Sequence, residues 1–120
     1  MKFDPNHPSI KGPCLRVYIH KSGREWIPIA DILSLEGEKG YTWLNWTHGR
    51  RVSLPYSLKQ IQHLLPATHF LRVHRHYLLN RQFIERINHE VDGSYVSMTI
   101  GPKIPISRRR LPFVEQELNP

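Results

Sequence analysis

Hydrophobic and polar residues alternate over short stretches along most of the chain, a pattern typical of half-buried β-strands. Strands are predicted at residues 15–19, 26–29, 32–35, 41–46, 51–54, 83–87, 95–100 and 104–106. Ser22-Gly23 and His48-Gly49 supply turn residues between neighbouring stretches. Pro28 has no N–H to donate to a strand ladder, so it places its strand at a sheet edge or a bulge. The pattern therefore predicts a mainly β, antiparallel domain.

A helix is predicted in the middle of the chain, directly after Tyr56. Ser57 is a suitable N-cap, and Gln60 three residues later can complete a capping box. The apolar side chains that follow share one helical face; they are Leu58, Ile61, Leu64 and Leu65. Pro66 ends the helix because the residue before a proline avoids α-helical geometry.

A second, C-terminal helix is predicted, since Pro112 suits a first helical turn and Val114 and Leu118 share a face. Residues 1–13, in contrast, contain three prolines and predict a flexible N-terminal arm. Residues 14–120 are then expected to form a single domain, which is the usual number for a chain of 120 residues.

The charge balance narrows the choice of partner. The chain has 17 Lys and Arg against 10 Asp and Glu, a net charge of +7. Such an excess attracts polyanions, nucleic acid first and an anionic membrane surface second, although a solvated basic surface without such a partner has the same composition. Cys14 is the one cysteine, and no apolar stretch approaches the ~20 residues of a membrane span. We therefore expect a cytoplasmic protein with no membrane partner.

Three stretches carry candidate chemistry. In residues 70–80, the polar side chains Arg72, His74, Arg75 and His76 lie between apolar residues, an arrangement that presents donors to a groove. Residues 103–110 contain four cations, and an arginine fork matches O6 and N7 of guanine. In residues 36–40, Gly37 and Gly40 permit close backbone approach to a partner.

These stretches together resemble the LytTR family of DNA-binding domains. Residues 70–80, Phe-Leu-Arg-Val-His-Arg-His-Tyr-Leu-Leu-Asn, are similar to the family signature F-x-R-x-H-R-S-x-x-V-N. Residues 104–109, Ile-Pro-Ile-Ser-Arg-Arg, are similar to its I-P-V-S-R-R element. Weaker matches lie at residues 32–36, Tyr41, Ser57-Leu58 and Ile84. The resemblance runs from Trp26 to Leu118, and the two signatures at this spacing are specific only as a pair.

The resemblance implies an elongated β-rich fold whose loops enter successive major grooves on one face of a duplex. It implies that bases are read by His74, Arg75 and Arg109, with Lys39 or Tyr41 from an earlier loop. His76 replaces the small residue usual in the family and adds a donor, and Pro112 is unusual in the closing helix. The chain is expected to be a stand-alone, response-regulator-like member without a receiver domain or membrane segments.

The predicted function is sequence-specific binding of double-stranded DNA, used to regulate transcription. The residues expected to bind phosphates are Arg72, His76, Arg108, Arg110, Lys103, Lys59, Arg81 and Arg86. Two copies are expected to act as a homodimer or in tandem on repeats, with a sensor or receiver protein as a further partner. Catalytic residues, a cofactor and a metal are not expected.

Three alternatives follow from the same residues. The chain could be a protein-interaction module without DNA affinity of its own. It could be a histidine-based nuclease, since His74 and His76 would share a face of a strand and could pair as acid and base, or bind a metal with Cys14 or His69. The tryptophans at 26, 43 and 46 could stack single-stranded bases.

Trp43, Arg72 and Asn80 have structural interpretations as well. We expect Trp43 to face the core, with Leu44 and Trp46 on the opposite face. Arg72 could pair with Glu36 or Glu85, and Asn80 could simply hold a turn.

Overall fold

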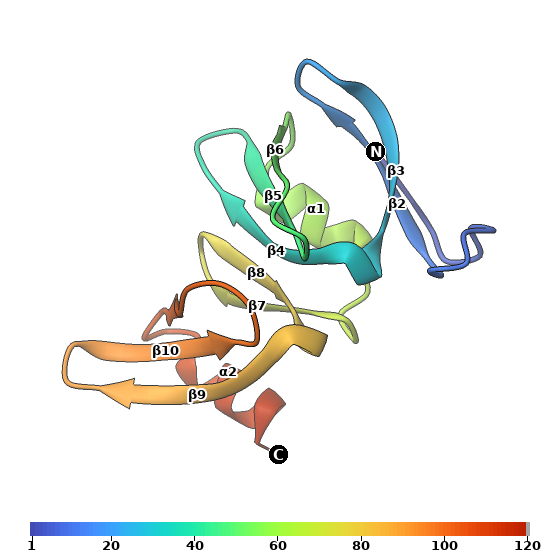
Figure 1. Ribbon diagram of the computed structural model, residues 1–120. Coiled ribbons are helices and arrows are strands. Elements are labelled where there is room, and N and C mark those ends of the chain that lie inside the picture. The colour runs from blue at the N-terminus through green and yellow to red at the C-terminus, as the bar shows by residue number, and fades with distance from the viewer. Residues whose placement is uncertain (120) are drawn as a thin grey trace.

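The computed structural model describes residues 1–119 and shows three antiparallel sheets that follow one another along a molecule of 43 × 30 × 24 Å (Figure 1). A short helix lies beside the central sheet and a second helix closes the chain. The predicted fold class, an elongated antiparallel β domain with two helices, is confirmed.

The elements are β1 (Lys2–Asp4), β2 (Cys14–Ile19), β3 (Gly23–Pro28), β4 (Ile32–Gly37), β5 (Thr42–Trp46), β6 (Arg51–Leu54), α1 (Leu58–Leu64), β7 (Phe70–His74), β8 (Tyr77–Asn80), β9 (Ile84–Glu90), β10 (Gly93–Met98), β11 (Ile104–Ile106) and α2 (Leu111–Leu118). Short 3-10 turns at Ile29–Asp31 and Arg81–Phe83 lead into β4 and β9. The sheet orders are β1-β2-β3, β6-β5-β4-β8-β7 and β11-β10-β9.

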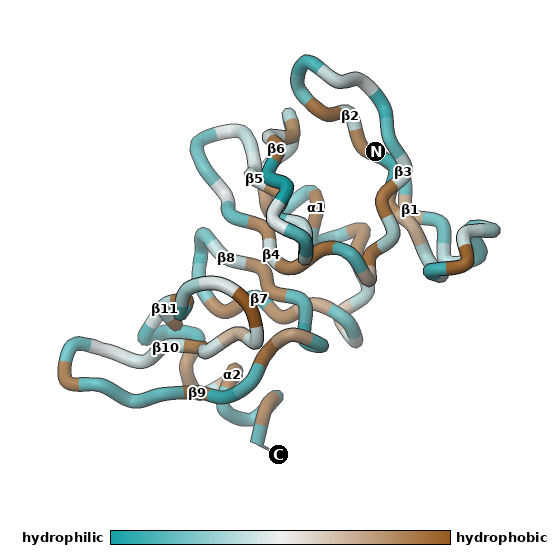
Figure 2. The backbone as a smooth tube through the Cα atoms, in the orientation of Figure 1, coloured by the Kyte–Doolittle hydropathy of each residue, from teal (hydrophilic) through white to brown (hydrophobic). Residues whose placement is uncertain are grey.

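The central five-stranded sheet separates two hydrophobic cores. One core fills the space between this sheet, α1 and the N-terminal sheet, and the other lies against the third sheet and α2. Leu78 belongs to the first core and its neighbour Leu79 to the second, because successive side chains of a strand point to opposite faces. Figure 2 shows hydrophobic positions in the strands between the layers and mostly hydrophilic hairpin tips. The tips are therefore free to meet a polar partner.

The predicted local signals are borne out at both helices. The Ser57 hydroxyl accepts from the backbone N–H of Gln60 at 3.1 Å, and the Gln60 side chain accepts from the N–H of Ser57 at 2.9 Å, which is a complete capping box. Pro112 lies in the first turn of α2. Pro28 ends β3, an edge strand as predicted.

Asn80 holds a turn, as its residue type suggested. Its side chain is buried, donates to the carbonyls of Ile29 and Ile32, and accepts from the N–H of Gln82. It therefore links the two 3-10 turns that precede β4 and β9.

Three expectations differ from the structure. Within residues 1–13, where a flexible arm is expected, β1 pairs with β2. The prediction that Trp43 faces the core is wrong, because Leu44 and Trp46 are the buried side chains. Trp43 is half-buried, and the Arg51 Cζ lies 4.6 Å from the centroid of its ring. Gly37 is buried beside α1, where a Cβ would meet the Leu58 Cβ at 3.0 Å, so its close approach serves packing.

Candidate nucleic-acid interface

The candidate interface forms where the β7–β8 hairpin meets the turn that follows β11. The N–H of Ser107 donates to the carbonyl of Val73 at 3.0 Å and fixes the start of this turn beside the end of β7. Ser107 then accepts from the N–H groups of Arg110 and Leu111 at 3.0 Å each, which closes the turn and starts α2. The two stretches singled out in the sequence are thus adjacent in space.

A concave groove of about 760 Å³ opens between them. Its lining consists of His74, Arg75, Ser107, Arg109, Arg110 and Phe113. The three residues predicted to read bases from the two signatures therefore share one groove. Arg75 and Arg109 are exposed, and neither has an ion-pair partner among residues 1–119.

Phe113 is a groove residue that the sequence analysis missed. Its side chain exposes 51% of its surface beside the arginines, an unusual place for a large apolar group. The available signal was the helical pattern itself, because Val114 is buried in the core and its neighbour Phe113 must point elsewhere.

The side chain of Arg72 holds the β7–β8 turn through hydrogen bonds. Its Nε donates to the carbonyl of His74 at 2.7 Å, and its Nη2 donates to the carbonyl of Arg75. Its Nη1 donates to the Gln62 side chain in α1 at 2.5 Å. The half-buried guanidinium therefore holds the turn. The prediction that Arg72 pairs with Glu36 or Glu85 is wrong.

The two histidines have hydrogen bonds that fix their neutral forms. The N–H of His76 donates to Nδ1 of His74 at 3.1 Å, so the proton of neutral His74 lies on Nε2. Nδ1 of His76 lies 3.0 Å from the carbonyl of Gly37, which can only accept, so this nitrogen carries the proton. The rings stack with centroids 5.5 Å apart. His76 therefore uses its donor to fix the turn, and neutral His74 keeps one donor for a ligand.

Burial, reinforced by the neighbouring positive charges, lowers the pKa of two of these groups. Burial lowers the pKa of His74, and the neighbours His76, Arg75, Arg110 and Arg72 lower it further. Burial also lowers the pKa of Arg72, with a further contribution from Arg110. A groove whose cations destabilise one another is electrostatically suited to a polyanion.

The turn between β4 and β5 lies next to the same hairpin. The N–H of Gly37 donates to the carbonyl of His76 at 2.8 Å, and Glu38 and Tyr41 close the turn through a 2.8 Å backbone bond. In Figure 1 this turn and the β7–β8 turn lie on the same side of the molecule. Lys39 at its tip is exposed and Tyr41 is half-buried.

The other predicted phosphate-binding residues lie outside the groove. Arg108 lines a separate recess with Asp92 and Tyr95, so adjacent arginines of the turn point in different directions. Three of the remaining cations already pair with carboxylates; they are Arg81 with Glu117, Arg86 with Glu85 and Lys103 with Glu90. Ion pairs at the surface contribute roughly 0–1 kcal/mol. Lys59 is exposed in the first turn of α1.

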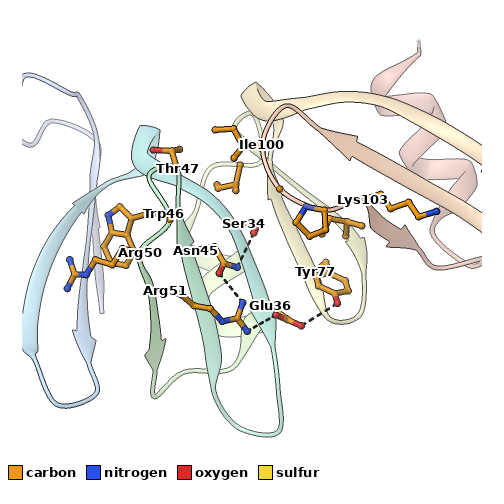
Figure 3. Close-up of a pocket in the computed structure, with 15 residues that line it drawn as sticks. Ser34, Glu36, Asn45, Trp46, Thr47, Arg50, Arg51, Tyr77, Ile100 and Lys103 are labelled. Carbon is orange, nitrogen blue, oxygen red and sulfur yellow. Dashed lines mark hydrogen bonds and ion pairs between the residues drawn. The ribbon is translucent and has the colours of Figure 1, made fainter.

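A second cleft, of about 370 Å³, lies between the central sheet and residues 100–104 (Figure 3). In its lining Glu36 lies between Arg51 and Tyr77, where it accepts from Arg51 at 2.9 Å and from the Tyr77 hydroxyl at 3.3 Å. Arg51 also donates to Asn45 at 2.9 Å. This network balances the charge of the Glu36 carboxylate with that of Arg51 and connects β4, β6 and β8 close to the β7–β8 turn.

Two further observations concern a possible metal site and membrane-spanning helices. Among residues 1–119, no group of three His, Cys, Asp or Glu side chains could hold a metal ion. Cys14 is buried in the N-terminal sheet. No helix in this part of the chain is long and apolar enough to cross a membrane.

Fold and groove together define a small β-rich module that presents cations from turns, as a nucleic-acid-binding domain does. Residues 23–119 match the family model of the LytTr DNA-binding domain. A solved LytTr DNA-binding domain from Bacillus cereus has the same fold, with a TM-score of 0.75, 23% identity, and coverage of 88% of this chain and 96% of that one. The chain therefore belongs to the LytTR family of DNA-binding domains, as its two signatures predicted.

A curated relative agrees with this assignment. The chain is 35% identical over 63 residues to the "Sensory transduction protein LytT" of Enterococcus faecalis (strain ATCC 700802 / V583). The match covers 52% of this chain and 26% of that protein, so the chain corresponds to only part of its relative.

Proposed function

We propose that this domain binds double-stranded DNA sequence-specifically and thereby regulates transcription, reading bases in the major groove with His74, Arg75 and Arg109. The observation that carries the proposal is the single groove in which these three side chains lie. Arginine matches the O6 and N7 acceptors of guanine, and the Nε2 proton of His74 can donate to either acceptor. Lys39 and Tyr41 extend the reading surface from the neighbouring turn.

The phosphate contacts divide into two groups. Arg110 in the groove and Arg108 beside it bind the backbone close to the bases that are read, while Lys59, Lys103, Arg81 and Arg86 bind farther away after exchanging any carboxylate partner. Arg72 and His76 act mainly by holding the hairpin turn in place, because their donors contact carbonyl groups.

A selection of bound sites from a random duplex library tests the proposal. The expected result is a defined site whose affinity falls steeply with salt, since several phosphates are neutralised. Equal binding of all duplexes would leave only non-specific DNA affinity. Absence of binding to any duplex would favour the protein-interaction module instead.

The selected sequence also tests the proposed arrangement. We infer that two copies bind repeats about one helical turn apart, as a homodimer or in tandem, within the cytoplasm. Repeats in the selected sites, together with a two-step binding isotherm, are expected. A sensor or receiver protein is the proposed source of the controlling signal.

A further inference from the structure

The N-terminal sheet carries a basic recess that shares no residue with the DNA-reading groove. The recess, of about 320 Å³, is lined by Met1, Lys2, Arg16, Tyr18, Arg24 and Tyr56. Lys2 and Arg16 precede residue 23, where the match to the family begins. The recess therefore combines residues that precede the matched range with Arg24 and Tyr56, which lie within it.

The register of the strands brings the three cations together. Lys2 of β1 lies directly opposite Arg16 of β2, and Arg24 of β3 is opposite Tyr18, diagonal to Arg16. Directly opposed side chains have Cβ atoms about 4.5–5.5 Å apart and diagonal ones about 7–8 Å, so like charges at these positions repel. No ion pair involves these three cations within residues 1–119.

A tyrosine adds a neutral donor to the recess. The hydroxyl oxygen of Tyr56 accepts from the N–H of Tyr18 at 3.1 Å, an arrangement that leaves its own proton free to be donated. No acceptor for that proton is found in the described chain. Three repelling cations and a spare O–H group suit an anion that accepts several hydrogen bonds, and a phosphate group meets both requirements.

We propose that this recess binds a backbone phosphate of the same DNA duplex, outside the sequence that the groove reads. The proposal rests on the proposed function of the groove. The molecule is 43 Å long, and its N-terminal sheet and the groove belong to different layers along it. A duplex turn measures about 34 Å, so a duplex that extends beyond the site is long enough to span the distance between the two surfaces.

The test compares two duplexes that carry the selected site. One ends within a few base pairs of the site, and the other continues for about one helical turn on each side. The wild type is expected to bind the long duplex more tightly and with a steeper salt dependence. The variant Lys2→Gln/Arg16→Gln/Arg24→Gln is expected to bind the short duplex with the affinity of the wild type. It is expected to lose most of the additional affinity that the flanking base pairs of the long duplex give the wild type.

The salt dependence gives a second readout of the same variant. With a slope of about −0.9 per phosphate neutralised, loss of the one phosphate contact should make the slope on the long duplex shallower by about 0.9. Lys21→Gln removes a cation from the β2–β3 turn outside the recess. It is expected to change neither the affinity for the long duplex nor the salt slope appreciably. Circular dichroism checks that both variants are folded.

The outcomes separate the two proposals and the possible sources of phosphate. If the wild type binds both duplexes equally, or if the triple variant keeps the gain, the recess does not bind the flanking backbone. If no duplex binds, the function proposed for the groove is wrong as well. Inorganic phosphate and vesicles of anionic phospholipid serve as further probes. Retention on vesicles without a flank effect would overturn the duplex assignment in favour of a lipid headgroup.

Discussion

The backbone N–H of Ser107 donates to the carbonyl of Val73 at 3.0 Å, and through this bond the two family signatures become one surface. Val73 is the last residue but one of β7, just before the hairpin turn, and Ser107 begins the turn that carries Arg109. The side chains that follow in each turn therefore line a shared groove. The proposed specificity depends on this juxtaposition.

Arg109→Ala should remove a base contact. The expected cost is about 1–3 kcal/mol on the selected site, with relaxed preference at one base position. Equilibrium binding to the site and to its single-base variants measures both effects. Arg108→Ala is the matched control, because Arg108 points into a different recess and is expected to weaken binding to all sequences uniformly. An equal loss on every sequence for Arg109→Ala would make Arg109 a phosphate contact.

Arg72→Met should act through the hairpin turn. The half-buried guanidinium donates to two carbonyls and Gln62, and solvent exposure reduces each bond below the roughly 1.5–3 kcal/mol of a charged hydrogen bond. The free energy of unfolding, measured in urea, should fall by about 1–3 kcal/mol. DNA affinity should fall while its salt slope stays unchanged. A shallower slope with unaltered stability would instead show that Arg72 binds phosphate.

The sequence predicted most strands because their alternation is local, but it could not show which face of a strand is buried. Trp43 and Trp46 lie on opposite faces of β5, and the burial of Trp46 depends on packing across the first core. The hairpin of β7 and β8 was missed because Leu78 and Leu79 enter different cores, so both faces of β8 are apolar. The resemblance implied a base-reading role for Arg109, whereas the place of Arg109 beside His74 depends on a hydrogen bond between segments distant in the sequence.

His74 should make stability depend on pH. Its pKa is lowered in the folded state by burial and by the surrounding cations, whereas the unfolded chain has an ordinary value of about 6.5. As the pH falls below this value, the unfolded state takes up the proton first, so the folded state loses stability. His74→Gln lacks this loss. As the pH is lowered from about 7.5 to about 5, the free energy of unfolding of the variant should therefore rise relative to that of the wild type, as measured by urea unfolding.

A constant difference between wild type and His74→Gln across this range would contradict the lowered pKa. His48→Gln is a suitable control, because His48 is exposed at the β5–β6 turn and lies outside the groove.

Phe113→Ala should change which bases are preferred more than how stable the domain is. The side chain is 51% exposed beside Arg109 and Arg110, and an apolar group at that place can contact the methyl group of thymine. Replacing single thymines of the selected site by deoxyuridine removes only this methyl group. At one position the wild type is expected to discriminate between the two bases and Phe113→Ala is not. If both proteins respond identically at every thymine, Phe113 has no role in reading this base.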